Sequence, residues 1–282
     1  MIYLITGATG DVGSRVVELL VQRGIRPRIF VRNAEKARAR FGDRVDVFTG
    51  DLADEEALRT VMAGADSLFL LNSGPAIPML DALAARAASA AGVAHIVKLS
   101  SIDVEQSLAI GAWHEKGEAA IRASGIPFTF VRPTGFMSNL LAWAHSIQAE
   151  DVVRTCTGDG RRAFIHSEDI AEVVVEALVS RKYLGRVLAI TGPEAVTFAE
   201  AAEKIGAAVG KLVRFEAISD EEAGRRFAAS GEPAEVVEAH VALWRAIREG
   251  RVGMVTNEVE RVVGRRPILL DTWVRENVEA FC

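Results

Sequence analysis

The chain has 282 residues, of which 50% are hydrophobic and 25% are charged, and its formal net charge is −5 at pH 7. This is an ordinary globular composition, and the length suits one large domain or a domain with a smaller lobe. Because the sequence has no basic excess and no long apolar run, it excludes nucleic-acid-binding and membrane-spanning proteins, and we expect neither kind of partner.

The first predicted strand, Ile2–Thr6, runs through a glycine-rich turn into a predicted helix, Val12–Arg23. Gly7, Gly10 and Gly13 follow the spacing G-x-x-G-x-x-G. Such a turn binds a pyrophosphate, because backbone N–H groups and the positive end of the helix dipole face the anion. A chance glycine turn is the alternative. We predict that the whole turn contacts a dinucleotide: Gly7, Ala8, Thr9, Gly10, Asp11, Val12 and Gly13.

The first half of the chain alternates short apolar runs with helical patterns. The predicted strands are Ile2–Thr6, Arg28–Val31, Val45–Thr49, Ser67–Leu71, His95–Leu99 and Phe128–Val131. The predicted helices are Val12–Arg23, Ala34–Phe41, Asp54–Met62, Pro78–Ala91 and Ala112–Ser124. Alternation of this kind predicts an α/β fold, a doubly wound parallel sheet whose two faces are both covered by helices.

After Pro133 the alternation loosens. We expect helices at Ser138–Gln148 and Ser167–Leu178, extended segments near Val153 and Phe164, and strands at Val187–Ile190 and Val213–Ala217. The last helix is predicted to begin with Asp271 as its N-cap. We therefore predict a dinucleotide-binding domain over residues 1–152, with returning segments near 163–192, and a small, mostly helical C-terminal lobe over 193–282 that covers the substrate.

The end of the second predicted strand indicates which dinucleotide is bound. In dinucleotide-binding folds an acidic residue there holds the ribose 2′-hydroxyl, but this chain has Arg32, with Lys36 nearby. A guanidinium binds a 2′-phosphate that a carboxylate would repel, so NADP(H) is preferred and NAD(H) is possible. The alternative is that both cations are solvated surface residues. Asp51 and Leu52 are predicted cofactor contacts: Asp51 would bind the adenine amino group, and its alternative is to cap a helix.

Cysteine and histidine positions limit other kinds of chemistry. Cys156 and Cys282 cannot form a disulfide framework, and the sequence opens on a strand at Ile2 with no room for a signal peptide. Both features favour a cytoplasmic protein. No histidine has partners at metal-ligand spacing, so we expect no metal. The sequence leaves open whether the protein is a monomer or a homodimer.

Several segments together indicate a family. They are TGATGDVG (Thr6–Gly13), VRN (Val31–Asn33), GDLAD (Gly50–Asp54), SGIPFTFVRPTGFMSN (Ser124–Asn139) and FIHSEDIA (Phe164–Ala171). The chain resembles the NmrA-like branch of the atypical short-chain dehydrogenase/reductases, and within it the type 2 NAD(P)H:quinone oxidoreductases. This resemblance implies a Rossmann domain, a bound nicotinamide dinucleotide and a small C-terminal lobe. It does not imply one activity, because the branch contains both reductases and redox-sensing regulators.

The resemblance also locates the catalytic position. Counting back from Glu118 places Ile110 where the superfamily has its catalytic tyrosine, and His114 where it has the lysine. His114 is similar to the histidine of the quinone-reductase relatives and is our candidate catalytic residue. We expect it to titrate in the physiological range and to donate a hydrogen bond or a proton. The alternatives are a helix-surface histidine or one that only binds the nicotinamide ribose.

The remaining site residues follow the ends of predicted strands. In relatives the turn after the sixth strand lies against the nicotinamide, although Arg132 before it could equally be buried for packing. We predict cofactor contacts from Leu71, Asn72, Ser73, Ser100, Pro133, Thr134 and Gly135. We predict an apolar pocket for a flat acceptor from Ser101, Trp113, Phe136, Met137 and Trp143, although aromatic residues at helical spacing are often core residues.

The sequence thus predicts an NADPH-dependent reductase that transfers hydride to a small electrophilic acceptor such as a quinone. A quinone tolerates the missing tyrosine, because its reduced anion is delocalised, whereas a simple ketone needs a positioned acid. Two alternatives remain: an NADP(H)-binding redox sensor without turnover, and a biosynthetic reductase of C=N or C=C bonds.

Overall fold

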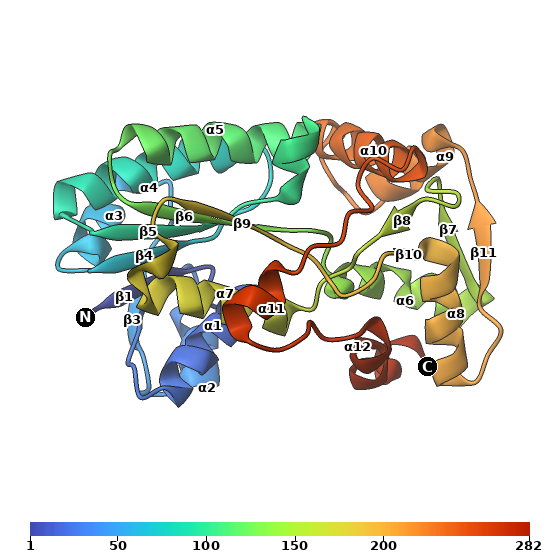
Figure 1. Cartoon of the computed structure of the whole chain (residues 1–282), viewed down its shortest axis with the longest axis horizontal. Helices are drawn as coiled ribbons and strands as arrows, with labels where there is room; N and C mark the ends of the chain where they lie inside the picture. The colour runs from blue at the N-terminus through green and yellow to red at the C-terminus, as the bar shows by residue number, and fades with distance from the viewer. The chain divides into compact units, whose positions relative to one another are not determined.

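The computed structural model describes the whole chain, Met1–Cys282, which divides into two compact units (Figure 1). The first unit consists of Met1–Ser101, Trp113–Arg132 and Ser167–Ala189, and the second of Ile102–Ala112, Pro133–His166 and Ile190–Cys282. The grouping differs from the predicted division at Ile102–Ala112 and at Pro133–His166, which join the second unit. The reason is that apolar side chains of these segments, such as Ile147 and Val153, complete the second unit's core.

The first unit is built on a seven-stranded sheet with the order β3-β2-β1-β4-β5-β6-β9. The strands are β1 (Tyr3–Thr6), β2 (Arg28–Val31), β3 (Asp46–Thr49), β4 (Ser67–Leu70), β5 (His95–Leu99), β6 (Phe128–Pro133) and β9 (Arg186–Ile190). Parallel pairing joins all neighbours from β3 to β6. The prediction of a doubly wound, mostly parallel sheet is confirmed, and the strand order reverses between β1 and β4, where such sheets bind ligands.

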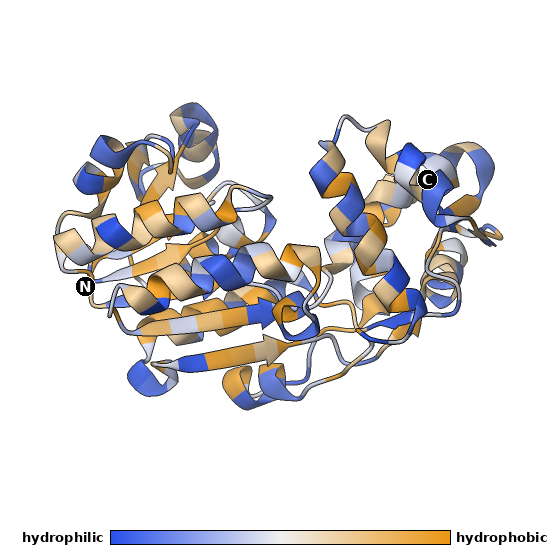
Figure 2. Cartoon of the chain, turned by 90° about the horizontal axis from the view of Figure 1, so that it is seen from above, coloured by the Kyte–Doolittle hydropathy of each residue, from blue (hydrophilic) through white to orange (hydrophobic).

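Helices cover both faces of this sheet. They are α1 (Asp11–Gln22), α2 (Ala34–Phe41), α3 (Glu55–Met62), α4 (Ile77–Ala91), α5 (Ala109–Ala123) and α7 (Ser167–Val179). Residues of α3, α4 and α5 such as Leu58, Ala84 and Ile121 share an apolar cluster with the strands. On the other face α1 packs along α7. Figure 2 shows the strands as largely apolar, which agrees with the complete burial of β1, β4 and β5.

The second unit is mostly helical. Its α-helices are α6 (Ala144–Glu150), α8 (Phe198–Val209), α9 (Asp220–Ala228), α10 (Ala234–Arg248), α11 (Glu258–Val263) and α12 (Leu270–Glu276). Two small sheets complete it: β7 (Val152–Thr155) pairs in parallel with β11 (Arg214–Ala217), and β8 (Arg161–Arg162) pairs antiparallel with β10 (Val196–Thr197). Phe164, Phe198 and Trp273 are among the buried residues of its core.

Two predicted helices differ from the structure. The expected helix Ser138–Gln148 is a 3-10 segment, Met137–Trp143, followed by α6. In the tighter 3-10 turn side chains three residues apart lie on one face, so Met137 and Leu140 are both buried, each with 1% exposure. The helix α12 begins at Leu270 with Leu269 as its N-cap, so the predicted N-cap Asp271 lies inside the helix, where its carboxylate pairs with Lys204 Nζ at 2.5 Å.

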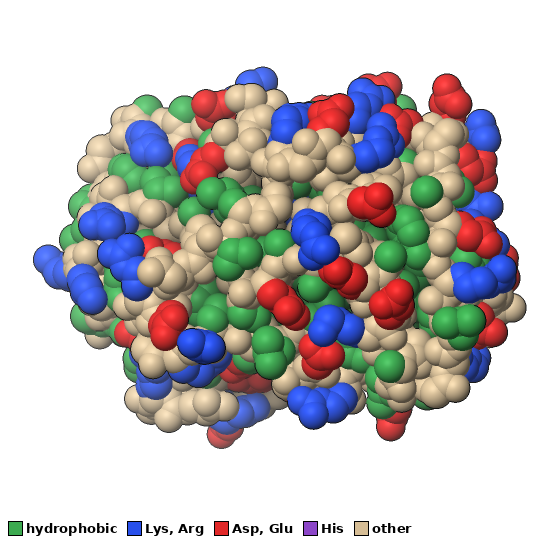
Figure 3. Space-filling model, turned by 45° about the vertical axis from the view of Figure 1, so that its right-hand side comes forward, with side chains coloured by type: hydrophobic (Ala, Val, Ile, Leu, Met, Phe, Trp, Pro, Cys, Tyr) green, Lys and Arg blue, Asp and Glu red, His purple; other side chains and the backbone are tan.

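The surface carries both signs of charge. Figure 3 shows Lys and Arg side chains interspersed with Asp and Glu side chains on the visible face. Many of them form exposed ion pairs, for example Arg59 with Glu56 and Arg26 with Asp46. Exposed pairs of this kind contribute little to stability. No helix of the protein combines the length and the apolarity that crossing a bilayer requires.

One helix start allows a direct test of the local structure. Thr197 caps α8: its hydroxyl accepts from Glu200 N at 3.0 Å, while the Glu200 carboxylate accepts from Thr197 N at 2.8 Å. Loss of such a cap costs about 1 kcal/mol. We expect Thr197→Ala to lower the unfolding free energy by about that amount in urea titrations. Thr197→Ser keeps the hydroxyl and is the control; an equal loss in both variants would contradict the cap.

Candidate functional site

A pocket of about 480 Å³ lies at the carboxyl ends of β1, β2 and β4, within the first unit. The structure brings together here predicted residues from the glycine turn, the end of β2, the turn after β3 and the end of β4. The lining residues are Thr6, Gly7, Ala8, Thr9, Gly10, Phe30, Val31, Arg32, Lys36, Gly50, Asp51, Leu52, Leu71, Asn72, Ser73 and Leu80. We call this cavity the strand-end pocket.

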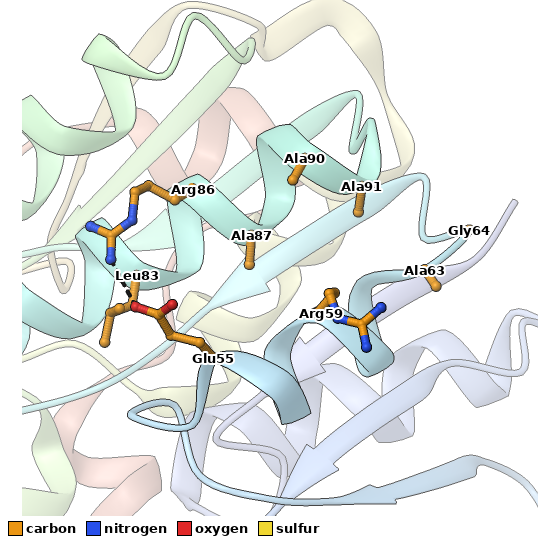
Figure 4. Close-up of a pocket in the computed structure, with 9 residues that line it drawn as sticks. All are labelled: Glu55, Arg59, Ala63, Gly64, Leu83, Arg86, Ala87, Ala90 and Ala91. Atoms are coloured by element: carbon orange, nitrogen blue, oxygen red, sulfur yellow. Dashed lines mark hydrogen bonds and ion pairs between the residues drawn. The ribbon is translucent and has the colours of Figure 1, made fainter.

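A larger hollow of about 650 Å³ lies between α3 and α4 (Figure 4). Its lining consists mainly of alanines of α4 and of Arg59, with an exposed ion pair between Glu55 and Arg86. The polar groups of this hollow are exposed arginine and glutamate side chains, and the rest of its lining is mostly alanine methyl groups. Such a lining offers no set of converging polar groups that could bind and orient a ligand. The strand-end pocket, which collects polar groups at the switch point of the sheet, is therefore the candidate site despite its smaller volume.

The glycine turn has the shape that a bound phosphate needs. Gly7 has φ +63°, a left-handed conformation that favours glycine, and a Cβ there would lie 2.8 Å from Leu71 Cδ2. A Cβ on Gly13 would lie 2.1 Å from the Gly7 carbonyl oxygen, so only glycine lets α1 approach the turn this closely. Gly10 begins α1 without a side-chain cap, which leaves the first N–H groups for an anion.

Two predicted residues of the turn contribute no free side chain. The Asp11 carboxylate accepts a hydrogen bond from Ser167 Oγ and pairs with Arg15 Nε at 3.4 Å. Val12 is 3% exposed and belongs to the core of the first unit. Asp11, Val12 and Gly13 do not line the strand-end pocket, and any contact they make to an anion comes from the backbone at the start of α1.

The cations predicted to bind a 2′-phosphate line the pocket. Arg32 and Lys36 are exposed, and neither side chain has an ion pair or hydrogen bond within the protein. No carboxylate of β2 competes for them. The carboxylate of Asp51, which also lines the pocket, accepts from Ala53 N at 2.9 Å and closes a local turn. The cap of α3 is Asp54, so the helix-capping alternative for Asp51 is wrong.

His114 lies on α5 and is 9% exposed, so the surface alternative is wrong. Its Nδ1 is buried without a hydrogen-bond partner. Burial, followed by the positive charges of Lys98 and Arg132, lowers the pKa of His114 to about 3. The expectation that this imidazole titrates in the physiological range is therefore wrong. At neutral pH His114 is uncharged, and it offers one N–H donor and one acceptor.

An ion pair between Glu118 and Arg132 lies in the same part of the first unit as His114. Glu118, four residues after His114, binds Arg132 through two hydrogen bonds of 2.9 and 2.7 Å. Ser100, a predicted cofactor contact, donates its hydroxyl to Glu118 at 2.6 Å and is 4% exposed. The packing alternative for Arg132 fits this arrangement, and the Ser100 hydroxyl is already engaged by protein.

The predicted nicotinamide turn, Pro133–Gly135, belongs to the second unit. Thr134 N donates to Ile190 O and Gly135 O accepts from Ile165 N, each at 3.0 Å. The Gly135 N–H is the remaining backbone donor of the turn. A Cβ on Gly135 would lie 2.6 Å from Arg162 Nε, so the glycine makes room for a buried arginine. A contact from this turn to a cofactor stays a prediction.

The predicted acceptor residues are divided between the units. Ser101 and Trp113 belong to the first unit, and Phe136, Met137 and Trp143 to the second. Met137 is 1% exposed in the core of the second unit, and the Trp143 ring lies 5.6 Å from the ring of Phe198. The burial of Met137 and the ring contact of Trp143 agree with the alternative that these residues belong to the core, and the acceptor pocket stays a prediction. No group of three His, Cys, Asp or Glu side chains gathers as metal ligands.

Sequence reasoning missed the lining residues Thr6, Phe30, Val31, Gly50 and Leu80, and a buried ion pair that does not itself line the strand-end pocket. The Thr6 hydroxyl accepts from Leu71 N at 2.8 Å and holds the end of β1 to the end of β4. Asp81 and Lys98 form a completely buried ion pair behind Asn72. The signal for the pair was present: Lys98 interrupts an otherwise apolar strand, and a charge inside a buried strand requires a partner.

Comparisons with known proteins show the family of the chain. Residues 7–181 match the family described as NAD(P)H-binding. A (4-alkanoyl-5-oxo-2,5-dihydrofuran-3-yl)methyl phosphate reductase of Streptomyces griseus is 38% identical over 99% of this chain and 98% of its own. An NAD(P)H azoreductase of Xenophilus azovorans is 31% identical over 99% of this chain and 98% of its own. The structure of an Escherichia coli NADPH-dependent quinone oxidoreductase complexed with NADPH matches with TM-score 0.89 at 25% identity. The match covers 98% of this chain and 99% of that chain.

The two buried histidines of the first unit predict how stability depends on pH. Burial lowers the pKa of His95 to about 4 and, with neighbouring cations, that of His114 to about 3. Because the unfolded chain binds these protons near pH 6.5, their stabilising contribution is complete above that pH and is lost as the pH falls toward 4 and 3.

We expect His95→Gln and His114→Gln each to flatten the plot of unfolding free energy against pH between 6 and 4.5, by about 1.4 kcal/mol per pH unit. Urea titrations at several pH values measure the slope. His145→Gln, which replaces an exposed histidine, is the control. If the slope of unfolding free energy against pH were the same in His114→Gln as in the wild-type protein, His114 would titrate in the folded state as it does in the unfolded chain.

Proposed function

This chain belongs to the NAD(P)H-binding family and is an NAD(P)H-dependent oxidoreductase, and we propose that it uses NADPH to reduce a small, flat, electron-poor acceptor such as a quinone. The observation that carries the proposal is the uncharged, buried His114 on a helix that has Ile110 at the tyrosine position. A site with this equipment can orient an acceptor but has no strong acid to protonate it.

The strand-end pocket supports NADPH as the preferred dinucleotide. The glycine turn and the uncapped start of α1 would hold the diphosphate, and Arg32 and Lys36 would hold the 2′-phosphate. Both cations lack partners in the protein, so no internal ion pair must be broken when a phosphate binds. The likeness to a quinone oxidoreductase solved with NADPH supports the same choice.

The bound dinucleotide supplies a hydride, and the protein's own groups decide which acceptors can take it. His114, uncharged at neutral pH, would donate one hydrogen bond to the acceptor oxygen or to the cofactor ribose. A hydrogen bond from a neutral imidazole stabilises a developing anion less than proton transfer from an imidazolium. The site therefore favours acceptors whose product anion is delocalised and can take its proton from water.

The names of the relatives support this acceptor class. They act on a quinone, on an azo compound and on an alkanoyl-oxo-dihydrofuran phosphate. What these groups share is a conjugated, electron-poor π system, which accepts hydride without a strong acid. The dihydrofuran phosphate reductase favours, as a second candidate acceptor, a C=C bond conjugated to a carbonyl.

A panel of acceptors tests the proposal. The protein is mixed with NADPH and a quinone, an azo dye, a conjugated enone or a simple ketone, and NADPH absorbance is followed. We expect turnover with the conjugated acceptors and a rate at least 10²-fold lower with the ketone, the range that a positioned acid contributes. Tight NADPH binding with no oxidation by any acceptor would instead support a redox sensor.

Cofactor preference is tested at Arg32. We expect Arg32→Ala to weaken NADPH binding by about 1.5–3 kcal/mol, the range for hydrogen bonds to charged groups, and to leave NADH binding almost unchanged. Isothermal calorimetry gives both dissociation constants. Arg38→Ala, which removes an exposed cation of α2, the helix that follows Arg32, and lies outside the strand-end pocket, is the matched control. Equal losses for NADPH and NADH would show that Arg32 does not read the phosphate.

The role of His114 is tested by rate and by pH together. If His114 donates only a neutral hydrogen bond, His114→Ala should lower kcat with a quinone by about 2- to 12-fold, which corresponds to 0.5–1.5 kcal/mol. The rate should show no His114-dependent step between pH 5 and 8, because its pKa is about 3. A loss above 10²-fold with a titration near pH 6.5 would identify a general acid instead.

A further inference from the structure

A lysine and an aspartate form a completely buried ion pair behind the strand-end pocket. Lys98 of β5 and Asp81 of α4 are both 0% exposed, and Nζ lies 2.6 Å from Oδ2. Taking two such charges out of water costs several kcal/mol each, and well-packed apolar residues in their place are often neutral or stabilising. Stability alone is therefore a weak explanation for the pair.

The pair has a third member that reaches the pocket. Asn72 follows β4 and lines the strand-end pocket, and its Nδ2 donates to Asp81 Oδ1 at 2.7 Å. The other polar atom of this amide, Oδ1, is buried and has no hydrogen-bond partner. An orphaned buried acceptor is costly, and because Asn72 lines the strand-end pocket, a ligand bound there is in a position to supply the missing donor.

The charge on Lys98 determines which way this amide faces. Asp81 is the carboxylate partner of Lys98 in this ion pair, and a carboxylate only accepts hydrogen bonds. The Asn72 amide must therefore turn its N–H toward Asp81 and its carbonyl oxygen away from it. The reversed amide would place two oxygen acceptors against each other. A lysine on the neighbouring strand thus decides that Asn72 presents an acceptor.

Close packing of α5 keeps the aspartate in place. A Cβ on Gly117 would lie 1.9 Å from Asp81 Oδ2, so the helix backbone closes over the carboxylate. Asp81 cannot swing toward solvent while α5 is packed there. The buried carboxylate is a rigid reference point for the Asn72 side chain.

We propose that Asp81 and Lys98 are positioning residues for the cofactor: they hold the Asn72 amide so that Oδ1 accepts a hydrogen bond from the bound dinucleotide. The partner must be a donor, which means a ribose hydroxyl or an amino or amide N–H. A diphosphate oxygen only accepts and is excluded. This inference rests on the proposed function only in that the strand-end pocket binds the dinucleotide.

A thermodynamic cycle tests whether the pair acts through Asn72. Calorimetry measures the NADPH dissociation constant of Asn72→Ala, of the double variant Asp81→Leu/Lys98→Met, and of the triple variant. One neutral hydrogen bond corresponds to about fivefold in affinity. We expect about fivefold weakening in all three, because once Asn72 is gone the pair has nothing left to position. Independent effects would multiply to about 25-fold in the triple variant.

A control variant and a conservative variant keep the test decisive. Glu55→Gln/Arg86→Gln removes an exposed ion pair that also involves α4, and it should leave the dissociation constant unchanged. If the double variant does not fold, Asp81→Asn keeps the volume and hydrogen-bonding groups but allows the Asn72 amide to reverse. It should also weaken NADPH by about fivefold.

Three results would overturn the inference. They are an unchanged dissociation constant in Asn72→Ala, an unchanged one in the folded double variant or in Asp81→Asn, and multiplied effects in the triple variant. The unchanged protein separates this inference from the proposed function. If the wild-type protein binds no NADPH, both the inference and the proposed function fail. If the wild-type protein binds NADPH and the variants bind it equally well, only the positioning role fails.

Discussion

The contact between the end of β1 and the end of β4 is the constraint on which the site depends. The Thr6 hydroxyl bonds to Leu71 N at 2.8 Å, and Gly7 lies so close to the Leu71 side chain that no Cβ fits between them. Because the strand order reverses between β1 and β4, this contact shapes the pocket at the switch point. The glycine turn, the cations after β2 and Asn72 all border the cavity that it creates.

Buried charge governs the chemistry beside this pocket. Lys98 with Asp81, and Arg132 with Glu118, are ion pairs with little or no exposure. Their cations, added to burial, keep His114 uncharged at neutral pH. An uncharged histidine and a missing tyrosine together disfavour acceptors that need a proton in the transition state. The same features fit conjugated acceptors, so the interior electrostatics and the proposed substrate class agree.

Much of the first unit could be predicted from sequence. Strands such as Arg28–Val31 and His95–Leu99, and the helix Ala34–Phe41, have the expected bounds, because buried parallel strands and capped helices have strong local patterns. The region after Pro133 was less predictable. Its 3-10 segment and two-residue strands take their conformation from packing in the second unit, and local propensity does not override that packing.

The sequence by itself determined the sheet, the glycine turn and the cations at the end of β2, since each depends on residue type at a fixed chain distance from a strand end. Only the tertiary structure decided the ionisation of His114, the engagement of Ser100 by Glu118, and the orientation of Asn72. These properties depend on burial and on charges brought from other strands and helices. Chain distance does not encode such contacts, because they arise only when the elements pack together.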